Sequence, residues 1–351
     1  MKSDNSYFIL SSSCKIVNGA NRAIIIDYNR RNVYYIPNEY YDLIEMMDRK
    51  MVSYVESLMD DRDSLENLQN FLTFLIENEI GIIVDNPELF PKISDKIEPE
   101  PRIIKNAIIE VDEELFREAL FIKICNELRE LFCIDIQIRL YSNLNLQFLS
   151  KLIDIITDND FRYLEVLCIY DDNLDINTLH SFMENTPLLS TLIMYQAPEN
   201  NKIDVVIETA PSTSISLGQI FLLKEVFEPE KSCGIINIQT LDFSHIHNFN
   251  RLKEQNGCLY KKIAIDRKGN IKNCPSFNFD YGNINNKSIN EIVKLTEFTK
   301  YWYLSKNLID TCKFCEYRYN CTDCRVFICN KDNIHSKPIK CSYNLQTGSW
   351  D

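Results

Sequence analysis

The most constraining feature of the sequence is a dense group of cysteines in its C-terminal part. Eight of the 13 cysteines fall within residues 258–341, and four of them form the run Cys312-x2-Cys315-x5-Cys321-x2-Cys324. Two thiols separated by two residues can turn toward the same ion, and this run contains two such pairs. The spacing therefore predicts metal ligation. The alternatives are a disulfide framework, which belongs to oxidising compartments, or free buried thiols.

The short gap between the two pairs limits the kind of metal site. A structural zinc ribbon separates its two cysteine pairs by about 15–20 residues so that both can close on one ion. Here only five residues lie between the pairs. The gap predicts two neighbouring sites that share this segment and are completed by Cys258, Cys274 and Cys341. Ligation by scattered thiolates favours iron–sulfur clusters, with zinc as the alternative.

The order and spacing of these cysteines resemble the SPASM domain, which is a C-terminal extension of many radical S-adenosylmethionine peptide maturases and carries auxiliary iron–sulfur clusters. The resemblance includes Gly269, which lies between Cys258 and Cys274. It implies two clusters of the 4Fe–4S type. The ligands it implies for one cluster are Cys312, Cys315, Cys321 and Cys341, and those for the other are Cys258, Cys274 and Cys324, with Cys329 or an external ligand in fourth place. Cys329 is a candidate because the family has three residues before its fourth clustered cysteine, whereas this chain has two.

The resemblance extends over nearly the whole chain, to the SPASM-containing maturase of grasp-with-spasm peptide systems (graspetide-type). It rests on these motifs: Asn21-Arg22, residues 24–27, Tyr34-Tyr35-Ile36-Pro37-Asn38, Glu88-Leu89-Phe90-Pro91-Lys92, Ile265-Asp266, Gly269-Asn270-Ile271-Lys272-Asn273-Cys274-Pro275-Ser276 and Gly282-Asn283-Ile284. In such systems an ATP-grasp ligase modifies a ribosomal precursor peptide. The resemblance implies that the partners of this chain are the leader segment of a precursor and the ligase.

One motif of radical S-adenosylmethionine enzymes is missing. These enzymes place Cys-x3-Cys-x2-Cys after the first strand of their barrel, whereas this chain continues after residues 108–111 with Asp112-Glu113-Glu114-Leu115-Phe116. S-adenosylmethionine is therefore not expected as a cofactor. Three functions stay open: an accessory maturase that binds the precursor, a redox enzyme that modifies the peptide itself, and a zinc-stabilised scaffold. The missing motif favours the first, because function must be argued from the site.

The chain is predicted to be of the α/β class and to have four parts. Residues 1–84 form a winged-helix-like domain that recognises a leader peptide by adding it as a strand, residues 85–102 a Pro-rich linker, residues 103–250 a partial (β/α) barrel, and residues 251–351 the SPASM domain. The middle part is too short for an eight-fold barrel. Leucine-rich repeats are the competing interpretation, because Leu164-x-x-Leu167 and Leu189-x-x-Leu192 recur at a similar interval.

Hydrophobic periodicity predicts the elements of these parts. Strands are expected at 23–27, 33–36, 82–84, 108–111, 134–140, 164–170, 189–195 and 235–238, and helices at 65–76, 116–131, 146–156 and 176–183. Gly81 is expected to end the first helix. Cys125, Cys133 and Cys168 lie among apolar residues and are interpreted as buried structural thiols. His245 and His247 are expected on a strand, as ordinary surface or packing side chains rather than a metal pair.

Charge and hydropathy exclude two classes of partner. The formal net charge is −13, which disfavours binding to nucleic acid and to anionic membranes. No apolar run approaches the 18 residues of a membrane span, and Phe8-Ile9-Leu10 is too short for an export signal. The chain is therefore predicted to be cytoplasmic.

Overall fold

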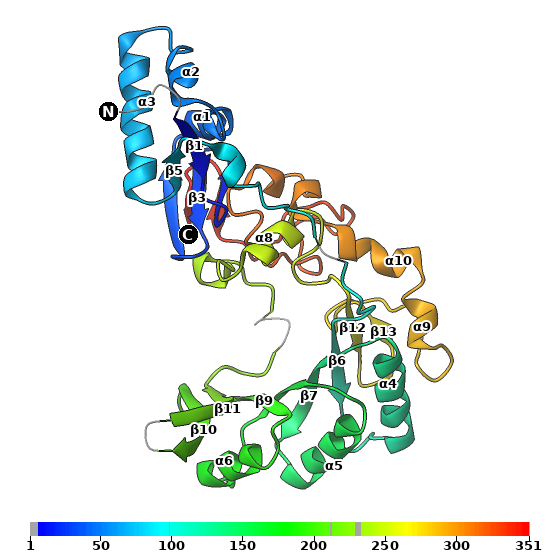
Figure 1. Ribbon diagram of the computed structural model, residues 1–351. Coiled ribbons are helices and arrows are strands. Elements are labelled where there is room, and N and C mark those ends of the chain that lie inside the picture. Colours follow the sequence, from blue (N-terminus) through cyan, green and yellow to red (C-terminus); the bar gives the residue numbers. More distant parts are fainter. Residues whose placement is uncertain (1–5, 98, 211–212, 229–232, 351) are drawn as a thin grey trace.

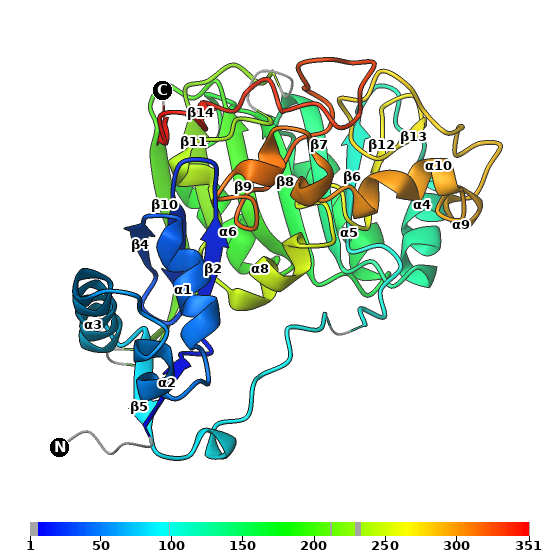
Figure 2. The same cartoon turned by 90° about the horizontal axis from the view of Figure 1, so that it is seen from above.

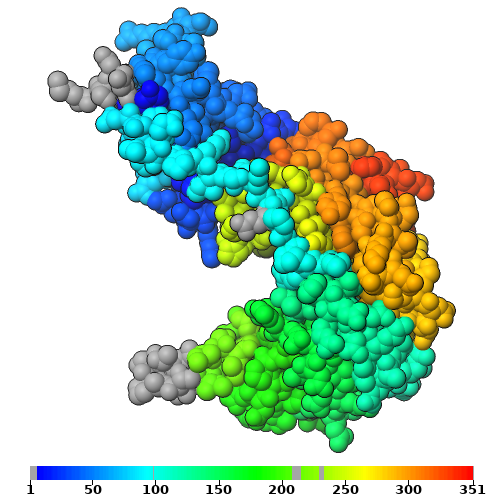
Figure 3. Space-filling model, turned by 45° about the vertical axis from the view of Figure 1, so that its right-hand side comes forward, coloured from blue at the N-terminus to red at the C-terminus, as the bar shows by residue number. Residues whose placement is uncertain are grey.

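The computed structural model describes residues 6–97, 99–210, 213–228 and 233–350. It has a C-like outline (Figure 1), with a small N-terminal domain at one end, a large sheet at the other and the cysteine-rich part between them. The space-filling view shows a wide hollow enclosed by this outline (Figure 3). None of the described helices is long and apolar enough to cross a membrane.

The N-terminal domain packs helices against short strands, as the sequence predicts. Its elements are β1 (Tyr7–Leu10), β2 (Cys14–Asn18), β3 (Ala23–Asp27), β4 (Asn32–Ile36), α1 (Glu39–Met47), α2 (Val52–Glu56), α3 (Arg62–Glu77) and β5 (Gly81–Val84). The expected hairpin of β3 and β4 is confirmed, and β2 extends it to a three-stranded sheet. The role expected of Gly81 is wrong, because α3 ends at Glu77 and Gly81 starts β5. A Cβ at this position would lie 2.4 Å from a ring carbon of Phe8, so the pairing of β1 with β5 requires a glycine here.

Strand β3 is buried on both faces, which shows that the N-terminal sheet is covered on both sides. Ile25 packs with the helices of the N-terminal domain, whereas Ile24 and Ile26 pack with Phe249 and Tyr317 of the cysteine-rich part. The N-terminal domain is therefore docked onto the segment that carries the second cysteine pair, and it shares a hydrophobic core with that segment.

Polar contacts at this junction surround Arg22. Its Nε donates to Glu316 Oε1 at 3.0 Å, its guanidinium donates to the carbonyl oxygen of Gly348 at 2.9 Å, and the same group stacks on the ring of Tyr35 at 4.1 Å. The side chain of Glu316 is only 1% exposed, so Arg22 neutralises a carboxylate that water does not reach.

Replacing Arg22 with methionine is expected to loosen this junction. The buried Glu316 would keep its charge without its cation, which should cost about 1–3 kcal/mol of unfolding free energy. Hydrogen exchange should accelerate at the amides of β3, measured by mass spectrometry on the full chain. Arg62→Met, at an exposed position of α3, is the control. Equal exchange in the two variants would contradict this role of Arg22.

The Pro-rich segment 85–102 runs as an extended connection, as predicted, apart from the short 3-10 turn η1 (Pro87–Leu89) (Figure 2). Asp95 holds its middle in place by ion pairs with Lys15 at 2.7 Å and with Lys253 at 3.2 Å. The linker is therefore pinned to both the N-terminal domain and the cysteine-rich part.

The large sheet has eight strands in the order β10-β11-β9-β8-β7-β6-β12-β13. Its elements are β6 (Asn106–Val111), α4 (Glu118–Glu130), β7 (Asp135–Asn143), α5 (Leu146–Thr157), β8 (Tyr163–Ile169), α6 (Ile176–Glu184), β9 (Leu189–Tyr195), β10 (Asn201–Ala210), β11 (Thr213–Leu223), β12 (Lys262–Ile265) and β13 (Ile271–Lys272). Strands β6 to β9 are parallel and joined by the three expected helices, so the alternation predicted from the sequence is confirmed. Strand β12 adds to β6, so the sheet continues into the cysteine-rich part of the chain.

The end of the sheet beyond β9 differs from the prediction. Residues 235–238 form no strand; Ile236 makes only an isolated bridge with Cys341, and the turn η2 (Ile238–Thr240) follows. The position beside β9 is taken by β11, which pairs with β10 as a hairpin. These two strands were missed because polar residues and Gly218 interrupt their apolar positions, which weakens the periodic signal on which the prediction depends.

Helices α4, α5 and α6 cover one face of the sheet and form the main core with it. Cys125, Cys133 and Cys168 are buried in this core, as expected for structural thiols, and burial raises the pKa of Cys125 and of Cys133 to about 12. None of the described helices covers the other face, which borders the hollow of Figure 3. Here the ring of Phe227 stacks between those of Tyr141 and Tyr195.

Candidate metal centre

The cysteine-rich part consists of short elements joined by turns. They are α8 (Ile246–Leu252), α9 (Ile289–Ile292), α10 (Thr296–Thr299), η3 (Lys300–Tyr303), η4 (Lys306–Leu308), η5 (Cys312–Phe314), β14 (Tyr343–Asn344) and β15 (Ser349–Trp350). The expected strand at His245 and His247 is wrong, because His245 caps α8 and His247 lies in its first turn. Both histidines are exposed, which agrees with their interpretation as ordinary surface side chains.

The first group of thiols forms around the hairpin of β12 and β13. Gly269 has φ +82° in its turn, and the hairpin brings together Cys258, which precedes β12, and Cys274, which follows β13. Burial raises the pKa of the Cys274 thiol to about 12, and repulsion from a Cys258 thiolate adds to the rise. Burial also raises the pKa of Cys324, with a contribution from Cys258. Cys258, Cys274 and Cys324 therefore lie in one neighbourhood of the folded chain.

The structure adds Cys233 to this first group. The pKa of Cys324 is raised first by burial and then by the thiolates of Cys258 and Cys233, and the charge of Cys233 also acts on Cys274. Cys233 could not be recognised from the spacing of the cysteines, because it lies 25 positions before Cys258 and outside the motif. Folding brings it to the site because residues 233–236 lie beside residues 340–342 of the cysteine-rich part.

The second group consists of Cys312, Cys315, Cys321 and Cys341, the set that the resemblance implies. Burial raises the pKa of Cys321 to about 11, and the thiolate of Cys312 contributes to this rise. The pKa of Cys315 is raised by burial and by Cys321 and Cys312, and that of Cys312 by burial and by Cys341. The four thiols are thus electrostatic neighbours in the folded chain.

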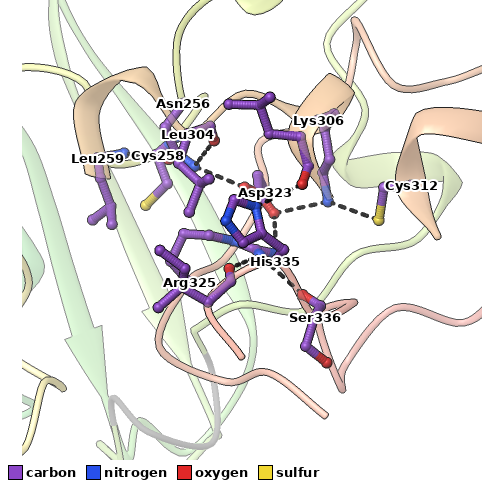
Figure 4. A network of polar contacts seen from close by, with 12 residues as sticks. Asn256, Cys258, Leu259, Leu304, Lys306, Cys312, Asp323, Arg325, His335 and Ser336 are labelled. Carbon is purple, nitrogen blue, oxygen red and sulfur yellow. Dashed lines mark hydrogen bonds and ion pairs between the residues drawn. The ribbon is translucent and has the colours of Figure 1, made fainter. Parts of the chain in front are cut away.

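A buried network of charges lies between the two groups (Figure 4). Asp323 Oδ1 accepts from Lys306 Nζ at 2.8 Å and from Arg325 at 2.6 Å, and the three side chains are 1%, 4% and 0% exposed. The other oxygen, Asp323 Oδ2, accepts from Asn256 Nδ2 at 2.7 Å. Asn256 in turn accepts from the backbone N–H of Cys258 at 3.0 Å, and Lys306 Nζ lies 3.5 Å from Cys312 Sγ. Asp323 therefore connects the loop of the first thiol group with a sulfur of the second.

Arg325 lies next to Cys324 in the sequence, and its side chain is fully buried. It donates to the carbonyl oxygens of Ile334 and Ser336 as well as to Asp323. Arg318 contacts Asn18 of the N-terminal domain and the carbonyl oxygen of Cys315 at 3.0 Å. The two arginines thus hold the backbone around the thiols in place by donating hydrogen bonds to oxygen atoms.

Each thiol group is accompanied by an excess of positive charge. In the network of Figure 4, Lys306 and Arg325 face the single carboxylate of Asp323, so one positive charge is left over. At the first group, Lys262 Nζ lies 3.5 Å from Cys258 Sγ, and no carboxylate of the described residues pairs with it. Burial acts to lower the pKa of Lys262, but the thiolates of Cys258 and Cys274 outweigh it and raise the pKa. Charges taken out of water require compensation, which neutral thiols do not give and thiolates bound to a metal do.

The thiols themselves suit a soft metal or an iron–sulfur cluster. All 13 cysteines are free, so the disulfide alternative is not realised. Across the described residues, no three cysteine, histidine, aspartate or glutamate side chains are placed closely enough to hold an ion. Loading therefore requires the sulfurs to close in and to lose their protons. Because the thiol pKa values are raised, metal affinity should fall as the pH falls.

A radical enzyme would hold its cluster just after the first strand of its barrel. In this chain the corresponding place, at the carboxyl end of β6, carries carboxylates instead. A cavity of about 60 Å³ lies here, and its lining includes Glu110, Asp112, Asp266 and Arg267 but no cysteine among the described residues. Glu110 accepts from Tyr141 Oη at 2.5 Å, and Arg267 stacks on the Tyr141 ring at 4.6 Å. Carboxylates are hard oxygen ligands, which suit an iron–sulfur cluster poorly.

Comparison with known proteins finds no family and no curated protein that matches the chain. Among solved structures the chain is similar to SuiB of Streptococcus suis, with 10% identity, a TM-score of 0.32 and coverage of 95% of this chain and 99% of SuiB. SuiB bound to S-adenosylmethionine gives a TM-score of 0.31 at 10% identity. SuiB bound to the precursor peptide SuiA gives 0.29 at 9% identity, with coverage of 94% and 98%. These scores denote a loose similarity, and the function is therefore argued from the residues of this chain.

Proposed function

We propose that this chain is an accessory maturase for a ribosomally synthesised peptide. Its N-terminal domain binds the leader of the precursor, and its cysteine-rich part holds two thiolate-ligated metal clusters, of the iron–sulfur type. An ATP-grasp ligase is the proposed partner enzyme. The sequence has no glycine-rich phosphate loop, which assigns the ATP chemistry to that partner.

The excess of positive charge at both thiol groups is the main observation that supports the proposal of two metal centres. Lys262 at the first group and Lys306 at the second each place an ammonium 3.5 Å from a cysteine sulfur. Four thiolates around a metal cluster leave a net negative charge, which these cations would offset. Lys262 has no carboxylate partner among the described residues and Lys306 shares Asp323 with Arg325, so a packing of neutral thiols would leave one positive charge uncompensated at each group. Zinc would satisfy the same charge balance and remains the alternative metal.

Strand β4 supports the leader-binding role. It is an edge strand of the β2-β3-β4 sheet, and along its outer side it pairs with no described strand. Tyr34 packs edge-to-face on Phe74 of α3, while Tyr35, on the opposite face, is 52% exposed. A peptide added to this edge would find α3 on one side and Tyr35 on the other.

A second candidate function is direct redox modification of the peptide, and the helix-free face of the large sheet favours it. This face borders the hollow of Figure 3. It carries Arg139, whose Nε donates to Gln137 Oε1 at 2.7 Å, beside the stacked rings of Tyr141, Phe227 and Tyr195. Arg139, Phe227 and Tyr195 are only 8–9% exposed and Tyr141 is half-buried, so a peptide on this face would reach Tyr141 most directly.

The metal content of anaerobically purified protein tests the proposal. We expect iron and acid-labile sulfide at about eight each per chain, as two four-iron clusters require. The double variant Cys312→Ala/Cys315→Ala should lose about half of both. About one or two zinc ions and no sulfide would identify the zinc scaffold instead, and a wild-type chain with no metal would overturn the proposal.

Product masses separate the accessory role from the redox enzyme. The precursor is co-expressed with the ligase, with and without this chain. An accessory maturase should raise the yield of the ligase product without adding a further mass change. A new mass shift that depends on this chain would establish the redox enzyme.

Leader binding should slow hydrogen exchange in β4. Adding the leader peptide to the full chain is expected to slow hydrogen exchange about 10-fold or more at the amides of Asn32–Ile36, because a new strand pairs with the free edge. Strand β10 is also an edge strand, at the far end of the large sheet, and serves as the internal control. Protection of β10 with none at β4 would place the leader elsewhere.

A further inference from the structure

The position of Cys233 follows from how its segment is held. Its carbonyl oxygen accepts from Lys340 Nζ at 2.8 Å. Ile236 donates to the carbonyl oxygen of Lys340 at 3.0 Å and accepts from the backbone of Ser342 at 3.2 Å. Residues 233–236 therefore run beside residues 340–342, next to Cys341 of the second thiol group.

Gly234 brings this segment against the first thiol group. It has φ +80°, a backbone conformation that favours glycine, and a Cβ built at this position would lie 3.0 Å from Cys324 Sγ. The backbone next to Cys233 thus contacts the sulfur of an expected ligand directly. The charge of Cys233 also acts on Cys274 and Lys262, so it faces the same neighbourhood as the other three thiols.

Cys329 lies in a different setting. Its side chain is exposed, and its backbone N–H donates to the carbonyl oxygen of Lys337 at 2.9 Å. The preceding residue, Ile328, bridges to Pro338. These contacts fix Cys329 in a surface loop.

We infer that Cys233, and not Cys329, is the fourth ligand of the metal centre formed by Cys258, Cys274 and Cys324. The inference rests on the metal centres of the proposed function and deepens it. With Cys233 in place, the first centre has four protein thiolates and no position left for an external ligand. Its role is then structural or that of an electron carrier, because a peptide has no open position at which to bind the metal.

Cobalt binding tests this assignment with a readout that is independent of activity. The full chain carrying Cys312→Ala/Cys315→Ala is titrated anaerobically with Co²⁺, so that the first centre is observed alone. The thiolate-to-cobalt charge-transfer band grows with each sulfur ligand. Adding Cys233→Ala should reduce this band by about a quarter, from four sulfurs to three, and weaken Co²⁺ binding at least about 10-fold. Adding Cys329→Ala should leave both unchanged.

Two further variants keep the test decisive if Cys233→Ala folds poorly. Cys233→Ser keeps the size of the side chain but should show the same loss, with a circular dichroism spectrum equal to that of the parent. Gly234→Ala should weaken Co²⁺ binding while the number of thiols stays the same. A full-strength band in Cys233→Ser, or a loss in Cys329→Ala instead, overturns the assignment. A parent chain that binds neither iron nor cobalt overturns the metal centre as well.

Discussion

Replacing Asp323 with asparagine should lower the free energy of unfolding by about 3–5 kcal/mol, because it leaves the buried cations Lys306 and Arg325 without an anion. The expected fall in melting temperature is about 6–20 °C, measured by calorimetry on the full chain. The loss should be accompanied by release of metal, since Asp323 also holds Asn256 and, through it, the Cys258 loop. Asp332→Asn, at an exposed position in the same part of the chain, is the matched control. A melting temperature equal to that of the control would show that the network does not hold the domain together.

The same network sets a direction for pH dependence. Burial acts to raise the pKa of Asp323, but the charges of Lys306 and Arg325 outweigh it and lower the pKa below its usual range. A carboxylate with a lowered pKa in the folded state contributes stability above its unfolded pKa of about 3.9. This contribution is lost as the pH falls from there through the folded pKa. The wild-type chain should therefore lose stability more steeply below about pH 4 than Asp323→Asn does.

If the first thiol group holds the proposed iron–sulfur cluster, replacing Lys262 with methionine should make the reduction potential of that cluster more negative by about 60–130 mV. The estimate converts the roughly 1.5–3 kcal/mol of a hydrogen bond to a charged group at about 59 mV per 1.4 kcal/mol. Lys262 suits this test because its ammonium faces Cys258 and no described carboxylate pairs with it. The substitution therefore leaves no carboxylate without its counterion. The direction follows because reduction adds negative charge beside the lost cation.

The measurement is a redox titration followed by electron paramagnetic resonance, which a merely structural role of Lys262 would not shift. Lys331→Met removes an exposed lysine from the same part of the chain and should leave the potential unchanged. The signal of the second centre, beside Lys306, serves as the internal reference. An unchanged potential in Lys262→Met would mean that the ammonium does not act on the metal centre.

The regular elements could be predicted from the sequence where a hydrophobic pattern recurs over a whole element. The alternation from β6 to β9 and the hairpin of β3 and β4 follow from such patterns. Strands β10 and β11 do not, because their apolar positions are interrupted by polar ones and the strands gain their place by pairing with each other and with β9. The docking of β3 against Phe249 and Tyr317 is a tertiary contact that no local pattern encodes.

The candidate site shows the same limit. The spacing of Cys312, Cys315 and Cys321 identified a thiol group, because ligands close in sequence must be close in space. Cys233 joins the other group only through the path of the segment after β11, which the spacing of cysteines does not reveal. Lys306 and Asp323 look like ordinary charged residues in the sequence, and only their burial shows that the fold depends on them.

The docked N-terminal domain places strand β4 close to the second thiol group. Tyr35 of β4 accepts a hydrogen bond from the hydroxyl of Tyr317 at 3.1 Å, and Tyr317 is two residues from Cys315. A leader on β4 and a metal at the second thiol group would thus be separated by a single layer of side chains. Thermodynamic reciprocity then applies: by whatever factor the leader changes the affinity for metal, metal loading changes the affinity for the leader. A chain without its metal would in that case also bind the leader with a different affinity.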